Sequence, residues 1–278
     1  MILVTGATGD VGGGVVRRLL AAGEKVRVLA RDPAKAAAQL GDVDVAKGDL
    51  LDEAALASAM TGAHKLFLMA HAQDLPEVAA KAVAAAQATG VRHVVLLSSY
   101  TVSTHGKTAI GRWHHEAEQA IEASKLGWTM LRPGNFSSNT LRWVPTIKGQ
   151  GSVFSPDGAS TSAPIDPADI AAVGAVALLA GGHEGKRYVL TSEQTLTVKE
   201  QVETIARVIG KPIRFVDVPV EAARAGMLKS GLSEELVDAI LELRGSAEAL
   251  QTKTVHDVTG RPARTYEEWV RAHAAAFA

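Results

Sequence analysis

The chain has 278 residues, a formal net charge of −1 and no cysteine, and 47% of its residues are hydrophobic. This length suits one large α/β domain, or one domain with a small lobe. The near-zero charge and the lack of a basic stripe argue against nucleic acid or an anionic membrane as partners. Without cysteine, the chain cannot use disulfides, thiolate nucleophiles or cysteine-ligated metals.

The start of the chain and its hydropathy pattern predict where the protein works. The first expected strand begins at residue 2, which leaves no room for a signal peptide, and no apolar run is long enough to cross a bilayer. We therefore expect a soluble, cytoplasmic protein that is a monomer or a homodimer.

The N-terminal stretch has the pattern of a strand, a glycine-rich turn and a helix. Ile2–Val4 is an apolar run typical of a buried strand, and glycines follow at positions 6, 9 and 12. Apolar residues then recur at helical spacing at Val15, Val16, Leu19 and Leu20. A dinucleotide-binding motif requires this context, although the spacing is G-x-x-G-x-x-G rather than G-x-G-x-x-G. The alternative is a glycine-rich turn in some other kind of α/β protein.

Each of the three glycines has its own expected role. Gly6 lets the chain turn sharply, Gly9 has no side chain to hold a pyrophosphate away from the backbone, and Gly12 lets the helix pack closely on the strand. The free amides and the positive end of the helix would then face the phosphates.

The end of the second predicted strand, residues 25–30, points to NADP(H). NAD-preferring folds carry an acidic residue near this place, which binds the ribose 2′-hydroxyl. Here Arg31 follows the strand, and a guanidinium would pair with a 2′-phosphate through two hydrogen bonds. Lys35 would assist it, whereas Asp32 could still face the ribose. The alternative is that Arg31 is an ordinary surface residue.

A weaker third strand is expected at residues 43–47, and it leads into Gly48, Asp49 and Leu50. Asp49 has two interpretations. It lies beside the adenine ring, or it caps the N-terminus of the helix predicted over residues 52–60.

Strands and helices alternate through the rest of the first half. Strands are predicted at 64–70 and 92–98, with the helix Leu75–Thr89 between them, and Gly90 ends that helix. This alternation implies an α/β fold, a doubly wound parallel sheet that binds ligands at the carboxyl ends of its strands. The carboxyl ends in question are 6–12, Arg31, 70–71 and 98–100.

The second half is expected to complete the sheet and to add a smaller lobe. A helix is predicted at 108–124 and a strand at 127–132, followed by a lid-like loop to residue 164, whose small side chains at 151–163 would leave room for a flat ring system. Further helices and strands are predicted at 166–181, 187–190, Val198–Ile209, 213–218, 219–245 and 265–277. Apolar positions along 222–243 are interpreted as core rather than as a dimer contact.

Several segments together resemble a known family: VTGATGDVGG at the start, then VLARDPAK, LLSSY, EQAIEASKLGWTMLRPGNF and, near the end, VTGRPARTYEEW. Over nearly its whole length the chain resembles the NmrA-like branch of the atypical short-chain dehydrogenases/reductases, and within it the NADPH quinone reductases and triphenylmethane-dye reductases. The resemblance implies a single NmrA-like NAD(P)-binding domain over 1–278, with NADP(H) preferred over NAD(H). Its Rossmann core would be about 1–133 plus 165–190, and its substrate lobe about 134–164 and 191–260.

The expected cofactor-binding residues lie along the strand ends and the turn after the sixth strand. They are Gly6, Thr8, Gly9, Asp10, Val11, Gly12, Arg31, Lys35, Asp49, Leu50, Ala70, His71, Ser98, Pro133, Asn135 and Phe136. The resemblance puts the nicotinamide near Ser98, Ser99 and residues 133–136. Asn135 would contact the nicotinamide amide or the substrate, or would only serve the turn beside Gly134.

The Tyr-x-x-x-Lys pair of most short-chain dehydrogenases is missing. With the family's glutamate placed on Glu118, Ile110 stands at the tyrosine position and His114 at the lysine position. The catalytic candidates are His114 as proton donor or substrate positioner, Tyr100 as a replacement phenol, and Ser98 as a partner of a carbonyl oxygen. Each also has a purely structural interpretation: a helix-face hydrogen bond, loop packing and turn capping, respectively.

Three functions are considered. The leading one is an NADPH-dependent oxidoreductase for a conjugated small-molecule acceptor such as a quinone or dye, because a cationic dye accepts hydride without a proton and a reduced quinone takes its proton from solvent. The alternatives are a non-catalytic NADP(H)-sensing regulatory protein of NmrA type, and a carbonyl reductase with a non-standard proton donor. The sequence has no metal-ligand spacing and no G-x-S-x-G elbow, so neither a metal nor a covalent nucleophile is expected.

Overall fold

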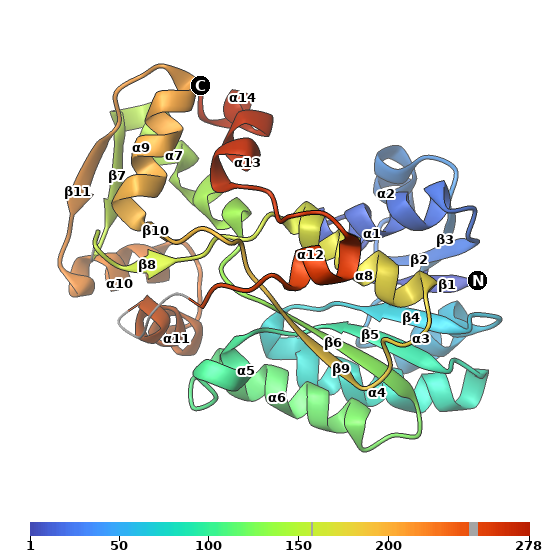
Figure 1. Cartoon of the computed structure of the whole chain (residues 1–278). Coiled ribbons are helices and arrows are strands. Elements are labelled where there is room, and N and C mark those ends of the chain that lie inside the picture. The colour runs from blue at the N-terminus through green and yellow to red at the C-terminus, as the bar shows by residue number, and fades with distance from the viewer. Residues whose placement is uncertain (157, 245–249) are drawn as a thin grey trace. The chain divides into compact units, whose positions relative to one another are not determined.

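A seven-stranded parallel sheet organises the first of the two units into which the chain folds (Figure 1). The computed structural model describes residues 1–156, 158–244 and 250–278, and the first unit comprises 1–133, 167–190 and 257–260. Its strands are β1 (Ile2–Val4), β2 (Val26–Ala30), β3 (Asp44–Lys47), β4 (Lys65–Leu68), β5 (His93–Leu97), β6 (Gly127–Pro133) and β9 (Lys186–Leu190).

The strand order β3-β2-β1-β4-β5-β6-β9 confirms the predicted doubly wound sheet. The chain winds outward from β1 in one direction through β2 and β3, and from β4 in the other direction through β5 and β6. The adjacent carboxyl ends of β1 and β4 therefore form the topological switch point, where such sheets bind their ligands. The central strands are apolar on both faces, and all five residues of β5 are buried.

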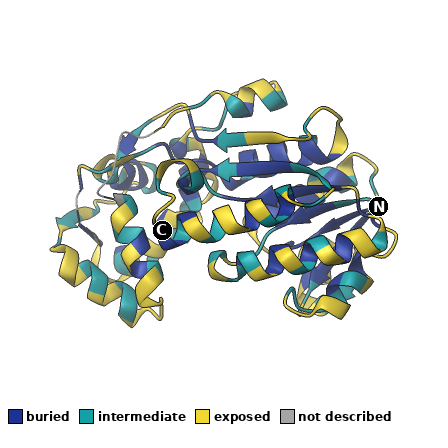
Figure 2. Cartoon of the chain, turned by 90° about the horizontal axis from the view of Figure 1, so that it is seen from below, coloured by how far each residue is buried: buried dark blue, intermediate teal, exposed yellow. Residues whose placement is uncertain are grey.

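Helices cover both faces of this sheet. On one face α3 (Glu53–Met60), α4 (Leu75–Thr89) and α6 (Ala109–Glu122) pack in a row. On the other face α1 (Asp10–Ala21) packs against α8 (Pro167–Leu179). Figure 2 shows the buried strands between helices whose outer sides are exposed. The shorter helices of the unit are η1 (Ala72–Asp74), α2 (Pro33–Leu40) and α5 (Thr101–Thr104).

The second unit comprises residues 134–166, 191–256 and 261–278. Its core is built around buried aromatic residues, among them Trp143, Tyr266 and Trp269, which pack with Val202 and Ile205 of α9 (Val198–Ile209). A capping box begins α9, because Thr197 and Glu200 hydrogen-bond each other's backbone amides. Helix α12 (Thr254–Thr259) crosses the boundary between the two units along the chain.

The segment from residue 134 to 164 is not the loop that the sequence analysis expected. It folds into η2 (Ser137–Trp143), α7 (Val144–Gln150), β7 (Ser152–Ser155) and β8 (Thr161–Ser162). β7 pairs in parallel with β11 (Arg214–Asp217), and β8 pairs in antiparallel with β10 (Leu196–Thr197). Such short strands exist because of partners that are distant in sequence, so local composition does not reveal them.

Some of the small side chains of this segment are used for packing. Ser152 and Ser155 are buried, and a Cβ on Gly158 would lie 2.5 Å from the ring of Phe215. These three small residues therefore allow close packing within the second unit, and the room for a flat ring system stays a prediction.

Two long helices expected in this unit are each divided. The segment 219–245 forms α10 (Val220–Lys229) and α11 (Glu234–Arg244), and Gly231 between them has a φ of +93°. Position 245 lies outside the described residues. The segment 265–277 forms α13 (Tyr266–Ala272) and α14 (Ala274–Phe277). Along 222–243, Val237 and Ala239 are buried in the core, whereas α10 has no buried residue.

Each helix in the part of the chain that the structure describes is too short or too polar to span a membrane.

Candidate functional site

A cavity of about 540 Å³ lies at the switch point of the sheet. The loops that follow β1, β2, β3 and β4 line it. Among the predicted cofactor residues, the lining includes Gly6, Thr8, Gly9, Arg31, Lys35, Asp49, Leu50, Ala70 and His71. Predicted cofactor residues from four separate segments, one after each of these strands, therefore line the same cavity.

The three glycines of the turn are constrained in different ways. Gly6 has a φ of +62°, and a Cβ there would lie 2.9 Å from Met69 Sδ. A Cβ on Gly12 would lie 2.3 Å from the carbonyl oxygen of Gly6, so helix α1 can approach the turn only with glycine at this position. A Cβ on Gly9 would make only ordinary contacts, the nearest at 3.4 Å. Gly9 lines the cavity, and its small size leaves room there for a ligand rather than for another part of the protein.

The N-terminus of α1 begins at Gly9, which lines the cavity. Gly9 is the N-cap without any side-chain cap, and the first helical hydrogen bond runs from Gly13 N to Gly9 O. The amides of residues 10–12 precede that bond, as they do in helices that bind phosphate. The side chain of Asp10 is exposed, whereas Val11 is buried, so Val11 can serve a ligand only through its amide.

Two residues that sequence reasoning missed support the turn from below. The hydroxyl of Thr5 accepts a hydrogen bond from Met69 N at 2.8 Å and donates one to Met69 O at 2.9 Å. This exchange joins the carboxyl ends of β1 and β4, and it places the Met69 side chain under Gly6. In the sequence, only the position of Thr5 directly before the first glycine indicated a role in supporting the turn.

A cationic pair lies at the end of β2. Arg31 and Lys35 line the cavity, and the Arg31 side chain is 79% exposed, with Nε 4.0 Å from Asp49 Oδ2. Asp32 Oδ1 accepts a hydrogen bond from Lys35 N at 3.0 Å and so caps α2. The two cations are therefore accessible to an anionic ligand. The carboxylate between them, that of Asp32, caps the N-terminus of α2.

The structure rules out one of the two interpretations of Asp49. The N-cap of α3 is Asp52, whose Oδ1 accepts hydrogen bonds from Ala54 N and Ala55 N. Asp49 Oδ1 instead accepts one from Leu51 N at 2.9 Å, and the residue lines the cavity. The helix-cap interpretation of Asp49 was wrong, because the helix begins three residues later than that role requires.

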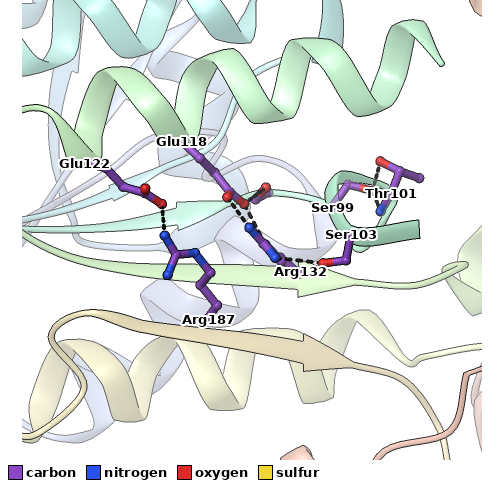
Figure 3. A network of polar contacts seen from close by, with 8 residues as sticks. Ser99, Thr101, Ser103, Glu118, Glu122, Arg132 and Arg187 are labelled. Carbon is purple, nitrogen blue, oxygen red and sulfur yellow. Dashed lines mark hydrogen bonds and ion pairs between the residues drawn. The ribbon is translucent and has the colours of Figure 1, made fainter. Parts of the chain in front are cut away.

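The carboxyl ends of β5 and β6 carry a buried polar cluster (Figure 3). Ser98 is 3% exposed, and its hydroxyl donates to Glu118. Glu118 is also paired with Arg132 of β6. The Ser98 hydroxyl therefore donates its hydrogen bond to Glu118 within the protein. Sequence reasoning missed Arg132; a charged residue at the end of an apolar strand was the signal.

His114 has a defined tautomer. Its Nδ1 lies 2.8 Å from the Ile110 carbonyl oxygen, which can only accept, so Nδ1 carries the hydrogen. Burial lowers the pKa of His114, although the Ile110 contact and Glu118 oppose that effect. The neutral ring therefore has Nε2 as a hydrogen-bond acceptor, and the helix-face hydrogen bond considered for His114 is present.

Tyr100 lies between Ser98 and α5 and is partly buried. Its amide donates to Pro133 O at 3.1 Å, and its ring is edge-on to His105. Burial raises the pKa of the Tyr100 phenol, so the phenol keeps its proton at neutral pH.

Asn135 and Phe136 belong to the second unit, where they pair with the strand-like segment before α8. Ile165 N donates to Asn135 O at 2.9 Å, and Asn135 Oδ1 accepts from Asn139 Nδ2 at 2.8 Å. The Asn135 side chain thus helps to hold the start of η2.

The sequence is similar to two curated reductases along its full length. It is 40% identical to a (4-alkanoyl-5-oxo-2,5-dihydrofuran-3-yl)methyl phosphate reductase of Streptomyces griseus, with 100% of this chain and 99% of the relative covered. It is 37% identical to an NAD(P)H azoreductase of Xenophilus azovorans, again with 100% and 99% covered.

The fold is similar to two solved structures of reductases. The NADPH complex of the Escherichia coli quinone oxidoreductase QOR2 superposes with a TM-score of 0.83 at 28% identity, over 98% of this chain and 99% of that chain. The triphenylmethane reductase of Citrobacter sp. superposes with a TM-score of 0.83 at 25% identity, over 98% of both chains. These likenesses confirm the resemblance expected from the sequence.

A family model described as NAD(P)H-binding matches residues 6–180. This range begins at the first glycine of the turn and ends directly after α8, so it contains all the residues that line the cavity. The chain therefore belongs to the NAD(P)H-binding family.

Proposed function

We propose that the protein is an NADPH-dependent oxidoreductase that transfers hydride to a conjugated acceptor such as a quinone or a dye. The observation that carries the proposal is the switch-point cavity, which has the glycine turn at the end of β1 and the Arg31–Lys35 pair at the end of β2. A dinucleotide phosphate needs both features, close backbone amides for the pyrophosphate and cations for the 2′-phosphate.

The residues present fit NADPH. Gly9 and the first-turn amides of α1 would hold the pyrophosphate, and Arg31 with Lys35 would hold the 2′-phosphate. Asp49 and Leu50 would contact the adenosine half, while Ala70 and His71 would lie toward the nicotinamide half. When bound, NADPH supplies the hydride, so the protein's task is to hold the acceptor and the cofactor in a reactive geometry.

The relatives support the class of acceptor. Their names denote an azo compound, a quinone, a triphenylmethane dye and an acyl dihydrofuranone phosphate. All four are π systems that take up electrons at a conjugated position. We propose that the second unit selects among such acceptors.

The proton donors on the first unit also suit these acceptors. Ile110 has no proton to give, and neutral His114 accepts rather than donates through Nε2. Tyr100 is the phenol at the carboxyl end of β5, and its raised pKa makes it a weak acid. Acceptors that need little or no assisted protonation fit this set better than simple ketones do.

The direct test is NADPH consumption by the purified protein with a panel of benzoquinones, naphthoquinones and triphenylmethane dyes, with NADH measured in parallel. We expect turnover that prefers NADPH. Protein that binds NADPH but consumes none with any member of the panel would contradict the proposal.

A further inference from the structure

One buried carboxylate joins four elements of the first unit. Glu118 of α6 is 1% exposed, and its Oε1 accepts hydrogen bonds from Ser98 Oγ at 2.5 Å and from Arg132 Nε at 2.9 Å. Its Oε2 accepts one from Arg132 Nη2 at 2.5 Å. Arg132 Nη1 then donates to Ser103 Oγ on α5 at 2.7 Å (Figure 3). Helix α6, the ends of β5 and β6, and α5 are thereby connected.

The cluster holds the loop 98–103 at both ends. Ser98 at its start is bonded to Glu118, and Ser103 at its end is bonded to Arg132. The loop backbone also pairs with β6, because Ser98 N donates to Leu131 O at 2.7 Å and Tyr100 N donates to Pro133 O at 3.1 Å. The loop is therefore hydrogen-bonded to the end of β6 through both its backbone and its side chains.

Stability alone does not explain a buried ion pair of this kind. Replacing such a pair with well-packed apolar residues is often neutral or stabilising, because taking both charges out of water costs free energy. A bidentate arginine–carboxylate pair instead fixes orientation, since its two parallel hydrogen bonds allow one geometry. The observed arrangement is of this type.

The loop lies on the edge of the sheet where a dinucleotide would place its second half. In doubly wound folds one mononucleotide half lies over β1–β3 and the other over β4–β6. The cavity residues cover the ends of β1 to β4, and the loop 98–103 follows β5 at the same edge. Resting on the proposed function, we propose that the cluster of Ser98, Glu118, Arg132 and Ser103 positions this loop against the nicotinamide half of NADPH. Glu118 is then a positioning residue that acts through the loop.

The same helix provides a matched control. Glu122, one turn after Glu118, pairs with Arg187 of the neighbouring strand β9 (Figure 3). The side chains of Glu122 and Arg187 are 30% and 40% exposed, and among the described residues neither side chain hydrogen-bonds to the loop 98–103. A Glu122→Gln variant therefore removes a similar charge from the same helix without touching the cluster.

The experiment compares two ligands by calorimetry: NADPH, and adenosine 2′,5′-bisphosphate, which carries only the adenine half. In Glu118→Gln an NH2 group replaces one carboxylate oxygen and faces the Arg132 guanidinium. Both groups are hydrogen-bond donors, so we expect the cluster to lose this hydrogen bond. We expect NADPH binding to weaken about tenfold, as when a supporting hydrogen bond behind a binding group is lost. Binding of the bisphosphate should stay within about twofold because its site is distant from the change. Glu122→Gln should leave both affinities unchanged within about twofold, since its pair is exposed.

If Glu118→Gln does not fold, Arg132→Lys tests the same cluster by changing the cationic partner of Glu118. An equal loss of affinity for both ligands would overturn the proposal, because it would show a general structural role; so would unchanged binding of both. If the wild-type protein turns over no quinone or dye, the proposed function fails, while the ratio of the two affinities still tests the positioning role.

Discussion

At the scale of single residues, Arg31 is the side chain on which the predicted preference for NADPH depends. It lines the cavity, it is mostly exposed, and its one ion pair within the described part of the chain is a 4.0 Å contact between Nε and Asp49 Oδ2. A hydrogen-bonded pair with a 2′-phosphate contributes about 1.5–3 kcal/mol, so Arg31→Ala should raise the KM for NADPH about 10–100-fold. The KM for NADH should change little, because NADH has no 2′-phosphate.

The control for Arg31 is Arg92→Ala, at an exposed arginine just before β5, at the opposite end of the sheet from the cavity. Steady-state kinetics with both cofactors would check the prediction. An equal rise in the KM for NADPH and the KM for NADH in Arg31→Ala would show that Arg31 does not bind the 2′-phosphate.

Alanine substitutions at two glycines of the turn should distinguish an effect on protein stability from an effect on NADPH binding. In Gly12→Ala the new Cβ meets the Gly6 carbonyl oxygen, and a backbone atom cannot rotate away, so we expect a loss of about 2–3 kcal/mol in the free energy of unfolding. Gly9→Ala makes only ordinary contacts at an extended φ of −93°, so its stability should change by less than about 1 kcal/mol.

The binding of NADPH should nevertheless fall in Gly9→Ala, because its methyl group lies where the pyrophosphate approaches the backbone. Urea unfolding and calorimetric titration of both variants would measure the two effects. If Gly9→Ala binds NADPH with wild-type affinity, the pyrophosphate does not lie over this turn.

At the scale of elements, the close contact of α1 with α8 depends on Gly14 of α1. A Cβ on Gly14 would lie 2.7 Å from the Ala171 Cβ, so the two helices approach closely only while position 14 has no side chain. Gly14→Ala should cost about 1–3 kcal/mol by overpacking. In the double variant with Ala171→Gly, part of that loss should return, because the methyl group is then carried by the other helix.

The check on this pair is a double-mutant cycle from urea unfolding. Ala171→Gly alone should cost about 1 kcal/mol from helix propensity. Strictly additive effects would mean that the two positions do not touch, against the packing described above.

Element boundaries also show what local patterns predict. The helix Val198–Ile209 was predicted to the residue, because a capping box precedes it and Gly210 follows it in a left-handed conformation. The segment 134–164 was misjudged, because β7 and β8 acquire their structure from β11 and β10, which lie about 60 and 35 residues later. Local signals therefore found the capped helix α9 and missed the short strands β7 and β8.

At the scale of the whole molecule, buried histidines should make the fold sensitive to acid. Burial lowers the pKa of His93 and of His114 below the ordinary value of 6.5. His93 is 3% exposed, and its Nδ1 has no hydrogen-bond partner among the described residues. The unfolded chain therefore binds more protons than the native protein as the pH falls through 6.5, and stability decreases in that direction.

We expect the free energy of unfolding to fall between pH 7.5 and pH 5.5, by at most about 1.4 kcal/mol per pH unit for each such histidine. Urea unfolding at intervals across this range would measure the slope, and His93→Leu should reduce it. A flat profile would show that these rings are protonated as readily in the native protein as in the unfolded chain.

The sequence by itself determined the fold class and the binding of NAD(P)H, and it predicts the preference for NADPH and the place of the phosphates. These follow from short-range signals: strand–turn–helix periodicity, three glycines at fixed spacing, and Arg31 directly after a strand. A turn, a cap or a strand end is made by neighbouring residues, so their order along the chain contains the answer.

Only the tertiary structure decided which groups remain available for chemistry. The Ser98 hydroxyl is used by Glu118, Asp52 rather than Asp49 caps α3, and the Nδ1 hydrogen of His114 is used by Ile110. The first of these depends on a partner 20 residues away, and the Glu118–Arg132 pair depends on how α6 lies on β6. Hydrogen bonds and burial arise between residues that packing brings together, and a residue's type and position in the sequence do not specify its partner.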